Sequence, residues 1–91
     1  MGYLVQKDEL FKILYETIEG KINPPPSKLC STLGAFRKNL SLEWLNKIKK
    51  HDAKSCLTCA IITILKYTDN PDASVRVIAY STLGAMLLCV A

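Results

Sequence analysis

The pentapeptide Ser31-Thr32-Leu33-Gly34-Ala35 occurs a second time, letter for letter, as Ser81-Thr82-Leu83-Gly84-Ala85. Each copy follows an Asn-Pro step, which is Asn23-Pro24 in the first half of the chain and Asn70-Pro71 in the second. Sequence repeats with periods of about 20 to 50 residues are typical of stacked helical arrays. The repeat therefore predicts two similar helical hairpins, with one pentapeptide in the second helix of each.

The spacing of apolar residues predicts helices on both sides of each turn. No part of the chain alternates with the two-residue period of a half-buried strand. We expect five helical segments, with Gly20 ending the first and with Asp8, Ser27 and Ser41 as N-terminal caps. The segments run over residues 7–19, 27–39, 41–50, from 52 to the turn at 69–72, and 73–91.

Inward-facing positions follow from the same spacing. On the second segment Leu29, Leu33 and Phe36 recur at helical intervals and are expected to face the core. The fourth segment has almost no polar face, which favours burial on nearly all sides. On the fifth segment the residues expected to point inward are Val75, Ile78, Ala79, Leu83, Met86 and Leu87. Within the pentapeptide, Gly and Ala beside the large Leu would let a neighbouring helix approach closely, with Ser and Thr toward the outer side.

The stretch from Leu65 to Leu87 resembles the HEAT repeat, in which an apolar helix, an Asn-Pro or Asp-Pro turn and a second helix follow one another. The matching positions are Asp72, Val75-Arg76, Ala79 and Leu83-Gly84. The resemblance implies that Asp72 caps the second helix and that Arg76 pairs with Asp69 or Asp72 at the turn. The first copy has no Val-Arg, and the expected helix at 41–50 is closer to the three-helix plan of armadillo repeats.

These features predict one all-α domain over residues 1–91, built from stacked antiparallel helical hairpins. Hairpin one would span about 7–39 and hairpin two about 52–91, joined by a connecting helix at about 41–50. The fold is then a HEAT/armadillo-like α-solenoid fragment or a small helical domain of about five helices. Because about three hairpins are usually needed for independent stability, we expect the apolar end at 87–91 to pack against more of a longer scaffold. A small domain that covers this end by dimerising is the alternative.

The composition favours a compact binding unit over an enzyme. With 49% hydrophobic and 22% charged residues in 91, the chain is too apolar for a disordered segment and leaves little spare stability for a deep cleft. His51, the sole histidine, lies between Lys50 and Asp52 at an expected helix junction, where a solvated side chain is the simpler interpretation. The sequence has no Gly-rich phosphate loop and no pair of acids in an apolar segment. We therefore expect no catalysis.

The four cysteines, Cys30, Cys56, Cys59 and Cys89, each lie in an apolar helical pattern. Such cysteines are expected to be free thiols that pack like small apolar residues. Cys56 and Cys59 are three residues apart on a helix, which leaves about 5–6 Å between their Cβ atoms and is too far for a disulfide. A zinc site would lack a second pair of ligands, so we expect no metal and no cofactor.

The sequence predicts an intracellular protein without a membrane span. The charged residues Lys7, Asp8 and Glu9 precede any long apolar run, so no signal peptide is expected. The apolar segment 77–91 is shorter than the ~20 residues that a bilayer crossing needs. The cytoplasm and the nucleus both remain open as locations.

Positive charge is concentrated between Arg37 and Lys54 and accounts for the net charge of +4. The basic residues of this cluster are Arg37, Lys38, Lys47, Lys49, Lys50 and Lys54. A solvated face, a surface for an acidic protein, and a surface for nucleic acid or an anionic membrane all remain open.

The sequence favours a non-catalytic protein–protein interaction scaffold or adaptor, with nucleic-acid or acidic-surface binding through residues 37–54 as the alternative. In helical arrays the second helices commonly line the concave side that binds partners. The residues expected to contact a partner are Lys28, Arg37, Lys38, Trp44, Lys47, Lys49 and Lys50. Self-association through the apolar C-terminal helix is a further expected interaction.

Overall fold

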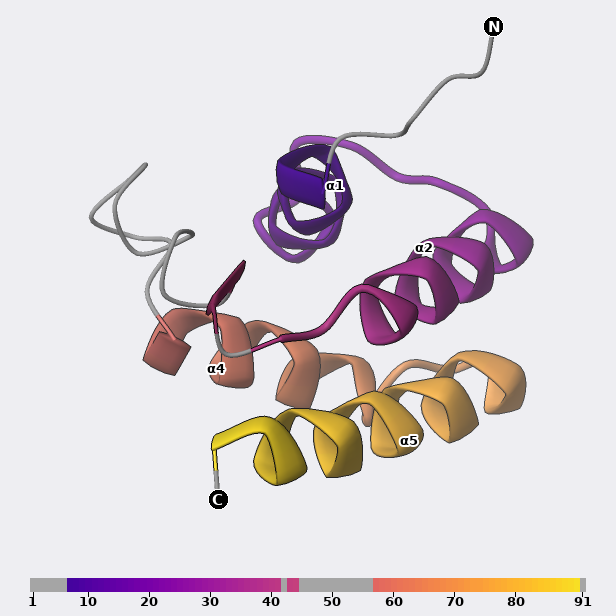
Figure 1. Cartoon of the computed structure of the whole chain (residues 1–91). Coiled ribbons are helices and arrows are strands. Elements are labelled where there is room, and N and C mark those ends of the chain that lie inside the picture. The colour runs from indigo at the N-terminus through magenta and orange to yellow at the C-terminus, as the bar shows by residue number, and fades with distance from the viewer. Residues whose placement is uncertain (1–6, 42, 45–56, 91) are drawn as a thin grey trace, which may run out of the picture.

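The structure, a computed structural model, describes residues 7–41, 43–44 and 57–90. Its four long helices are α1 (Lys7–Ile18), α2 (Pro26–Lys38), α4 (Leu57–Tyr67) and α5 (Ala73–Val90), and no strand occurs among these residues. α1 and α2 form one antiparallel hairpin, α4 and α5 form a second, and the two hairpins stack (Figure 1). The expected all-α fold of stacked antiparallel hairpins is therefore confirmed. The expected helix at 41–50 lies mostly outside the described residues.

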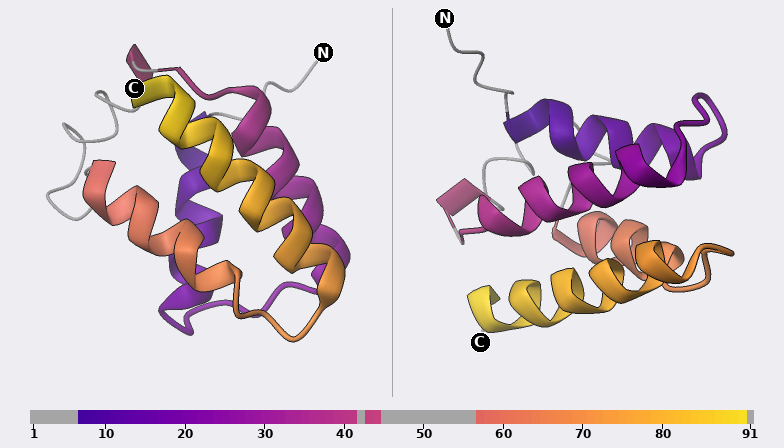
Figure 2. Two further views of the ribbon diagram at one scale, coloured as in Figure 1. Left: turned by 90° about the horizontal axis from the view of Figure 1, so that it is seen from below. Right: turned by 90° about the vertical axis from the view of Figure 1, so that its right-hand side faces the viewer.

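The hairpins stack so that their first helices lie side by side, and so do their second helices. Figure 2 shows α4 against α1 and α5 against α2, and the most extensive of these helix contacts joins α2 and α5. Each hairpin is also closed internally, by contact of α1 with α2 and of α4 with α5. The molecule is thus two layers deep, and α2 is packed between α1 and α5.

Local sequence sets the limits of hairpin one. Gly20 ends α1 with a φ of +80°, a left-handed conformation that favours glycine, and the Lys21 amide donates back to the Glu16 carbonyl at 2.9 Å. α1 begins at Lys7, and the predicted cap at Asp8 concerns a side chain outside the described ones.

α2 begins at Pro26, so the predicted cap at Ser27 is wrong. Pro25 is the N-cap, with extended backbone and no side-chain cap, and its carbonyl accepts from the amides of Lys28 and Leu29 at 3.0 and 3.1 Å. Proline suits the first position of a helix because its missing N–H would have no partner there. α2 ends at Lys38, close to the predicted end, with Asn39 as its C-cap.

The turn into α5 is held by polar groups of the turn itself. The Asp72 carboxylate accepts from the amides of Ser74 at 2.9 Å and Val75 at 3.3 Å, as expected for the cap of this helix. The Arg76 guanidinium donates to the carbonyls of Asn70 at 2.8 Å and Pro71 at 3.0 Å. Arg76 was expected to pair with an acidic side chain, but it bonds to these two turn carbonyls instead. The carbonyls lie between the helices, where no helical N–H reaches them, so the guanidinium supplies their partner.

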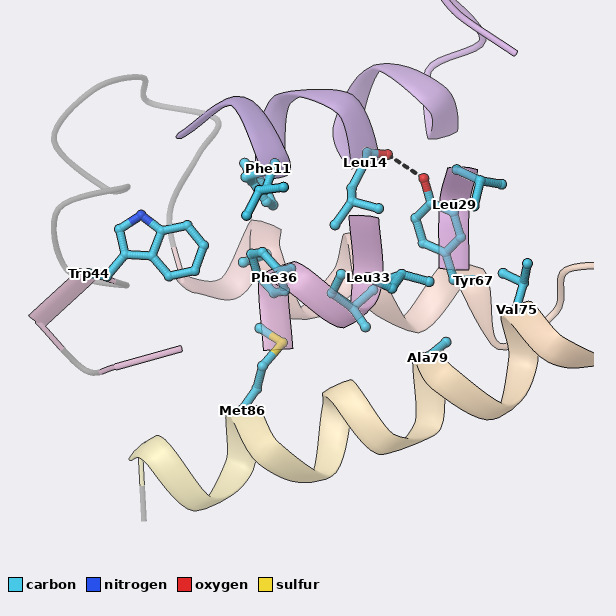
Figure 3. Close-up of a cluster of buried hydrophobic side chains, with 13 residues drawn as sticks. Phe11, Leu14, Leu29, Leu33, Phe36, Trp44, Tyr67, Val75, Ala79 and Met86 are labelled. Carbon is cyan, nitrogen blue, oxygen red and sulfur yellow. Dashed lines mark hydrogen bonds between the residues drawn. The ribbon is translucent and has the colours of Figure 1, made fainter. Parts of the chain in front are cut away.

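One hydrophobic core joins the hairpins (Figure 3). It includes the three residues predicted to face inward on α2, and Phe36 contacts Phe11 and Trp44 with ring centroids 6.2 and 5.1 Å apart. The buried apolar residues are Leu10, Phe11, Leu14, Leu29, Leu33, Phe36, Trp44, Ala60, Ile64, Tyr67, Val75, Ala79 and Met86.

A buried hydrogen bond ties hairpin two to hairpin one. The Tyr67 hydroxyl on α4 donates to the Leu14 carbonyl on α1 at 2.7 Å, and both side chains are fully buried (Figure 3). Burial raises the pKa of Tyr67 to about 12, while a hydrogen bond with the Thr17 side chain acts in the opposite direction. The phenol is therefore held in its neutral, donating form.

The two pentapeptides lie at equivalent places, in the second helix of each hairpin. Ser31 and Ser81 are exposed, but Thr32 and Thr82 are buried, so the prediction that Thr faces outward is wrong. Each threonine hydroxyl donates at 2.7 Å to the carbonyl four residues earlier in its own helix, of Lys28 or Ile78. That bond satisfies the hydroxyl, which removes the cost of burying the side chain.

Gly34 and Gly84 do not provide the close helix contact that the sequence suggested. Apart from the nearby backbone of its own helix, a Cβ at either position would meet no described atom within 4 Å. Glycine in a helix interior costs about 0.8–1.0 kcal/mol relative to alanine. Packing within the described chain therefore gives no reason for glycine at either position.

We expect Tyr67→Phe to lower the free energy of unfolding by about 0.5–1.5 kcal/mol at neutral pH, the usual net contribution of one hydrogen bond. The substitution should also make the free energy of unfolding depend less on pH in the alkaline range. The pKa of tyrosine is 10.0 without a shift and about 12 in the folded protein. The unfolded chain therefore loses this proton first, and wild-type stability should fall by up to about 1.4 kcal/mol per pH unit between these values. Urea denaturation of both proteins at pH 7, 10 and 11 measures the difference, and identical pH slopes would contradict it.

We expect the two leucines of the repeat to differ in their importance for stability. Leu33 is fully buried, whereas Leu83 is only partly buried. Leu33→Ala should therefore cost about 2–5 kcal/mol and Leu83→Ala less than half as much. Thermal unfolding followed by circular dichroism compares the two variants, and equal losses would show that the repeats share one environment.

Candidate protein interface

α5 is apolar on more than one side. From Val77 to Val90 it contains no charged residue, and its buried stripe consists of Val75, Ala79, Thr82 and Met86. A helix that is apolar all round is normally covered all round. α5, however, lies at the edge of the molecule, with α2 and α4 against it and no other described element on its far side (Figures 1 and 2).

The far side of α5 presents large apolar side chains to solvent. Val77 is 69% exposed, Tyr80 62%, Leu87 58% and Leu88 80%, and the exposed Gly84 lies among them. Steps of three and four residues place these five positions on one face of the helix. We call them the apolar face of α5. The prediction that Leu87 points inward is wrong, because the buried stripe passes through Met86 and Thr82 and leaves the next residue, Leu87, facing outward.

The other helix of hairpin two also has exposed apolar residues. On α4, Ile62 is 47% and Leu65 52% exposed, so the prediction that this segment is surrounded on nearly all sides is wrong. Among the described helices, α1 and α5 pack on two sides of α4. The side that carries Ile62 and Leu65 is exposed. Both helices of hairpin two therefore expose large apolar side chains.

The helices of hairpin one expose mainly polar residues. α1 exposes Glu9 and Lys12, and α2 exposes Lys28 and Ser31 along its length and Arg37 and Lys38 at its end. The contrast holds within the repeat, because Tyr80 and Gly84 are exposed while their counterparts Cys30 and Gly34 are half-buried. The two hairpins share a plan but differ in the chemistry of their outer surfaces.

The basic residues predicted as contacts do not form one cluster in the described chain. Lys28, Arg37 and Lys38 are exposed, but Lys28 and Lys38 are ten residues apart on α2, or about 15 Å along its axis. Arg37 and Lys38 occupy the last turn, where positive charge stabilises a helix C-terminus. The other predicted contacts, Lys47, Lys49 and Lys50, lie outside the described residues, as does Lys54.

Trp44, the aromatic residue predicted as a contact, belongs to the core. It is 4% exposed and meets the Phe36 ring edge-on at 5.1 Å, so this residue is corrected from contact to core. Its backbone amide donates to the Ser41 hydroxyl at 3.1 Å, which agrees with the predicted cap at Ser41. A large aromatic ring buries more surface than any other side chain, which favours the core over solvent.

Cys30, Cys59 and Cys89 are partly buried, and Cys30 and Cys89 are free thiols, as predicted. Within residues 7–41, 43–44 and 57–90, no group of three or more His, Cys, Asp or Glu side chains could hold a metal ion. Cys56 and His51 lie outside these ranges. None of the helices described has the length and apolar character that crossing a membrane requires.

Sequence reasoning found the candidate interface only in part. The uncapped apolar run at 87–91 indicated that the C-terminal helix needs a cover, but Val77 and Tyr80 were not identified. The signal was the lack of any charge between 77 and 90, since a helix with solvent on one side usually carries charges there. The chain matches no protein-family model, no curated protein and no solved structure, so the candidate interface rests on geometry alone.

Proposed function

We propose that this protein is a non-catalytic protein–protein interaction module, a scaffold or adaptor that binds through the apolar face of α5. The observation that carries the proposal is the exposure of four large apolar side chains on one uncharged helix face. Contiguous apolar patches of this kind mark surfaces that another protein covers, whereas single exposed apolar residues need no explanation.

The energetics favour a covered state. Complete burial of a Val, Leu or aromatic side chain is worth about 1.5–3 kcal/mol, so the four side chains together offer several kcal/mol to a complementary surface. The one charged residue of α5, Arg76, is bonded to turn carbonyls at the start of the helix, at one end of the face. A partner therefore needs an apolar surface along most of α5 and no matching charge.

The stacked hairpins support a relationship to HEAT or armadillo repeats, which we include in the proposal. The repeated pentapeptides occupy equivalent helices, and Asp72 caps α5 as the resemblance implies. Repeat proteins carry polar outer faces on their terminal repeats and apolar faces where repeats meet. Hairpin one has a polar outer face, as terminal repeats do, and hairpin two has an apolar one, as repeats do where they meet a neighbour. This difference suits a scaffold that packs against a further helical unit or another protein at α5.

The partner is, in this proposal, another protein with a helical, apolar surface, and self-association through α5 is one form of it. Binding of nucleic acid or of an acidic surface through residues 37–54 is the alternative. Lys47, Lys49, Lys50 and Lys54 of that set lie outside the described residues, and the proposal is built on the apolar face, whose large side chains are described and exposed. Free thiols at Cys30 and Cys89 agree with a reducing, intracellular location.

The test is a paired substitution on each surface of the full chain, produced in its native cells. Val77→Glu with Leu88→Glu should keep the unfolding free energy within about 0.5 kcal/mol, because both side chains are exposed. Proteins recovered by chemical cross-linking and quantitative mass spectrometry should fall at least tenfold.

The matched control is Lys28→Glu with Lys38→Glu, which reverses charge at two exposed positions of α2. It should leave the recovered set unchanged. Loss of partners in this control but not in the α5 variant would favour the acidic-surface or nucleic-acid alternative. No change in either variant would contradict the proposed function.

A further inference from the structure

We propose that the apolar face of α5 binds the same face of a second copy of this chain, in an antiparallel, twofold-symmetric pair whose helices cross at Gly84. This inference rests on the proposed function and specifies the partner, the symmetry and the crossing point.

The internal repeat indicates that a helix fits the middle of this face, because Cys30 and Gly34, the counterparts of Tyr80 and Gly84, are half-buried on α2. Leu33 and Gly34 on α2 are more buried than their counterparts Leu83 and Gly84 on α5. Within its own hairpin each second helix has an equivalent neighbour, α1 for α2 and α4 for α5. The difference in burial therefore arises because α5 packs on one side of α2, whereas no described helix packs on the corresponding side of α5. Ser27, Arg37 and Lys38, the counterparts of Val77, Leu87 and Leu88, are exposed, so the repeat indicates a covering helix only around Gly84.

α5 itself is the best match among the described helices. The exposed sides of the other three carry charge: Glu9 and Lys12 on α1, Lys28 and Lys38 on α2, and Lys66 on α4. Docking any of them on the apolar face would bury a charge without a partner, which is costly. The face of α5 is uncharged over its whole length and can be buried against itself without this penalty.

Gly84 gives the pair a natural centre. It lies midway between Tyr80 and Leu88, it is exposed, and apart from the nearby backbone of α5 itself no described atom lies within 4 Å of the place its Cβ would take. A twofold axis at Gly84 places Tyr80 opposite Leu88 of the second copy, and Leu88 opposite Tyr80 of the second copy. Such isologous pairing is the commonest symmetry of homo-oligomers, and the missing side chain at the axis lets the helices approach closely.

The available area is sufficient for a specific but modest dimer. At their observed exposures the four large side chains of the face present roughly 500 Å² per copy, or about 1,000 Å² from two copies, the lower limit of a specific interface. Burial on this scale suits dissociation constants of about 1–100 μM. Ile62 and Leu65 of α4 add to the apolar surface of hairpin two.

Sedimentation equilibrium of the purified full chain between about 1 and 500 μM tests the pair directly. We expect a reversible monomer–dimer equilibrium, and we expect Tyr80→Glu and Leu88→Glu each to weaken it at least tenfold. The matched control Lys28→Glu, on the exposed side of α2, should dimerise like the wild type. Circular dichroism at low concentration should give all these proteins the same helix content, which separates loss of pairing from loss of folding.

Cysteine cross-linking tests the crossing point. Gly84→Cys should form an intermolecular disulfide under mild oxidation, since a disulfide requires Cα atoms within about 7 Å and only a crossing near residue 84 brings two copies of it that close. Gly34→Cys, the equivalent position in hairpin one, is the matched control and should not cross-link beyond the wild-type level. The wild type measures the background from its own thiols.

A protein that is monomeric at all concentrations overturns the inference, as does a dimer that is indifferent to Tyr80→Glu or that cross-links equally at positions 34 and 84. Assemblies larger than a dimer also overturn it, since they indicate head-to-tail stacking of hairpins. These results leave the proposed function standing if Val77→Glu with Leu88→Glu still removes partners in cells, because another protein then occupies the face. If that variant has no effect in cells either, both proposals fail.

Discussion

The contact between the two hairpins is the constraint on which the rest of the structure depends. Neither hairpin can bury its apolar face alone, and the core forms where Leu33 and Phe36 of α2 lie opposite Ala79 and Met86 of α5 (Figure 3). The Tyr67 hydroxyl and the Leu14 carbonyl add one buried polar contact between the same hairpins. That contact is directional, so it favours one alignment of α4 on α1 in a way that apolar packing alone does not.

Much of this architecture could be predicted from the sequence, because local rules act within a few residues. Asp72 caps α5 and Gly20 ends α1 as their residue types indicate. The prediction of the inward-facing residues of α2 was also correct, because polar residues mark the opposite side of that helix. The predicted start of α2 at Ser27 was wrong because proline at the first helical position proved as suitable as a serine cap.

The candidate interface was harder to predict because it depends on which of two apolar sides of α5 packs inward. Both sides of that helix read alike in sequence, and only the position of α2 decides that Met86 is buried and Leu87 exposed. Charge was a less direct guide for the residues that the structure describes. Lysines and arginines are conspicuous in a sequence, but Lys28 and Lys38 turn out to lie far apart on one helix, and Trp44 fills the core. A helix without charges was the more informative signal.

The prolines before α2 have a consequence for the unfolded chain. Three successive rings at 24–26 fix three φ angles before any tertiary contact exists, so the link between α1 and α2 has less conformational entropy to lose when they come together. The later turn between α4 and α5 has a single proline, Pro71, and relies on the Asp72 and Arg76 side chains for its shape. Hairpin one is thus partly organised in advance by covalent geometry, whereas the second turn becomes ordered only as its hydrogen bonds form.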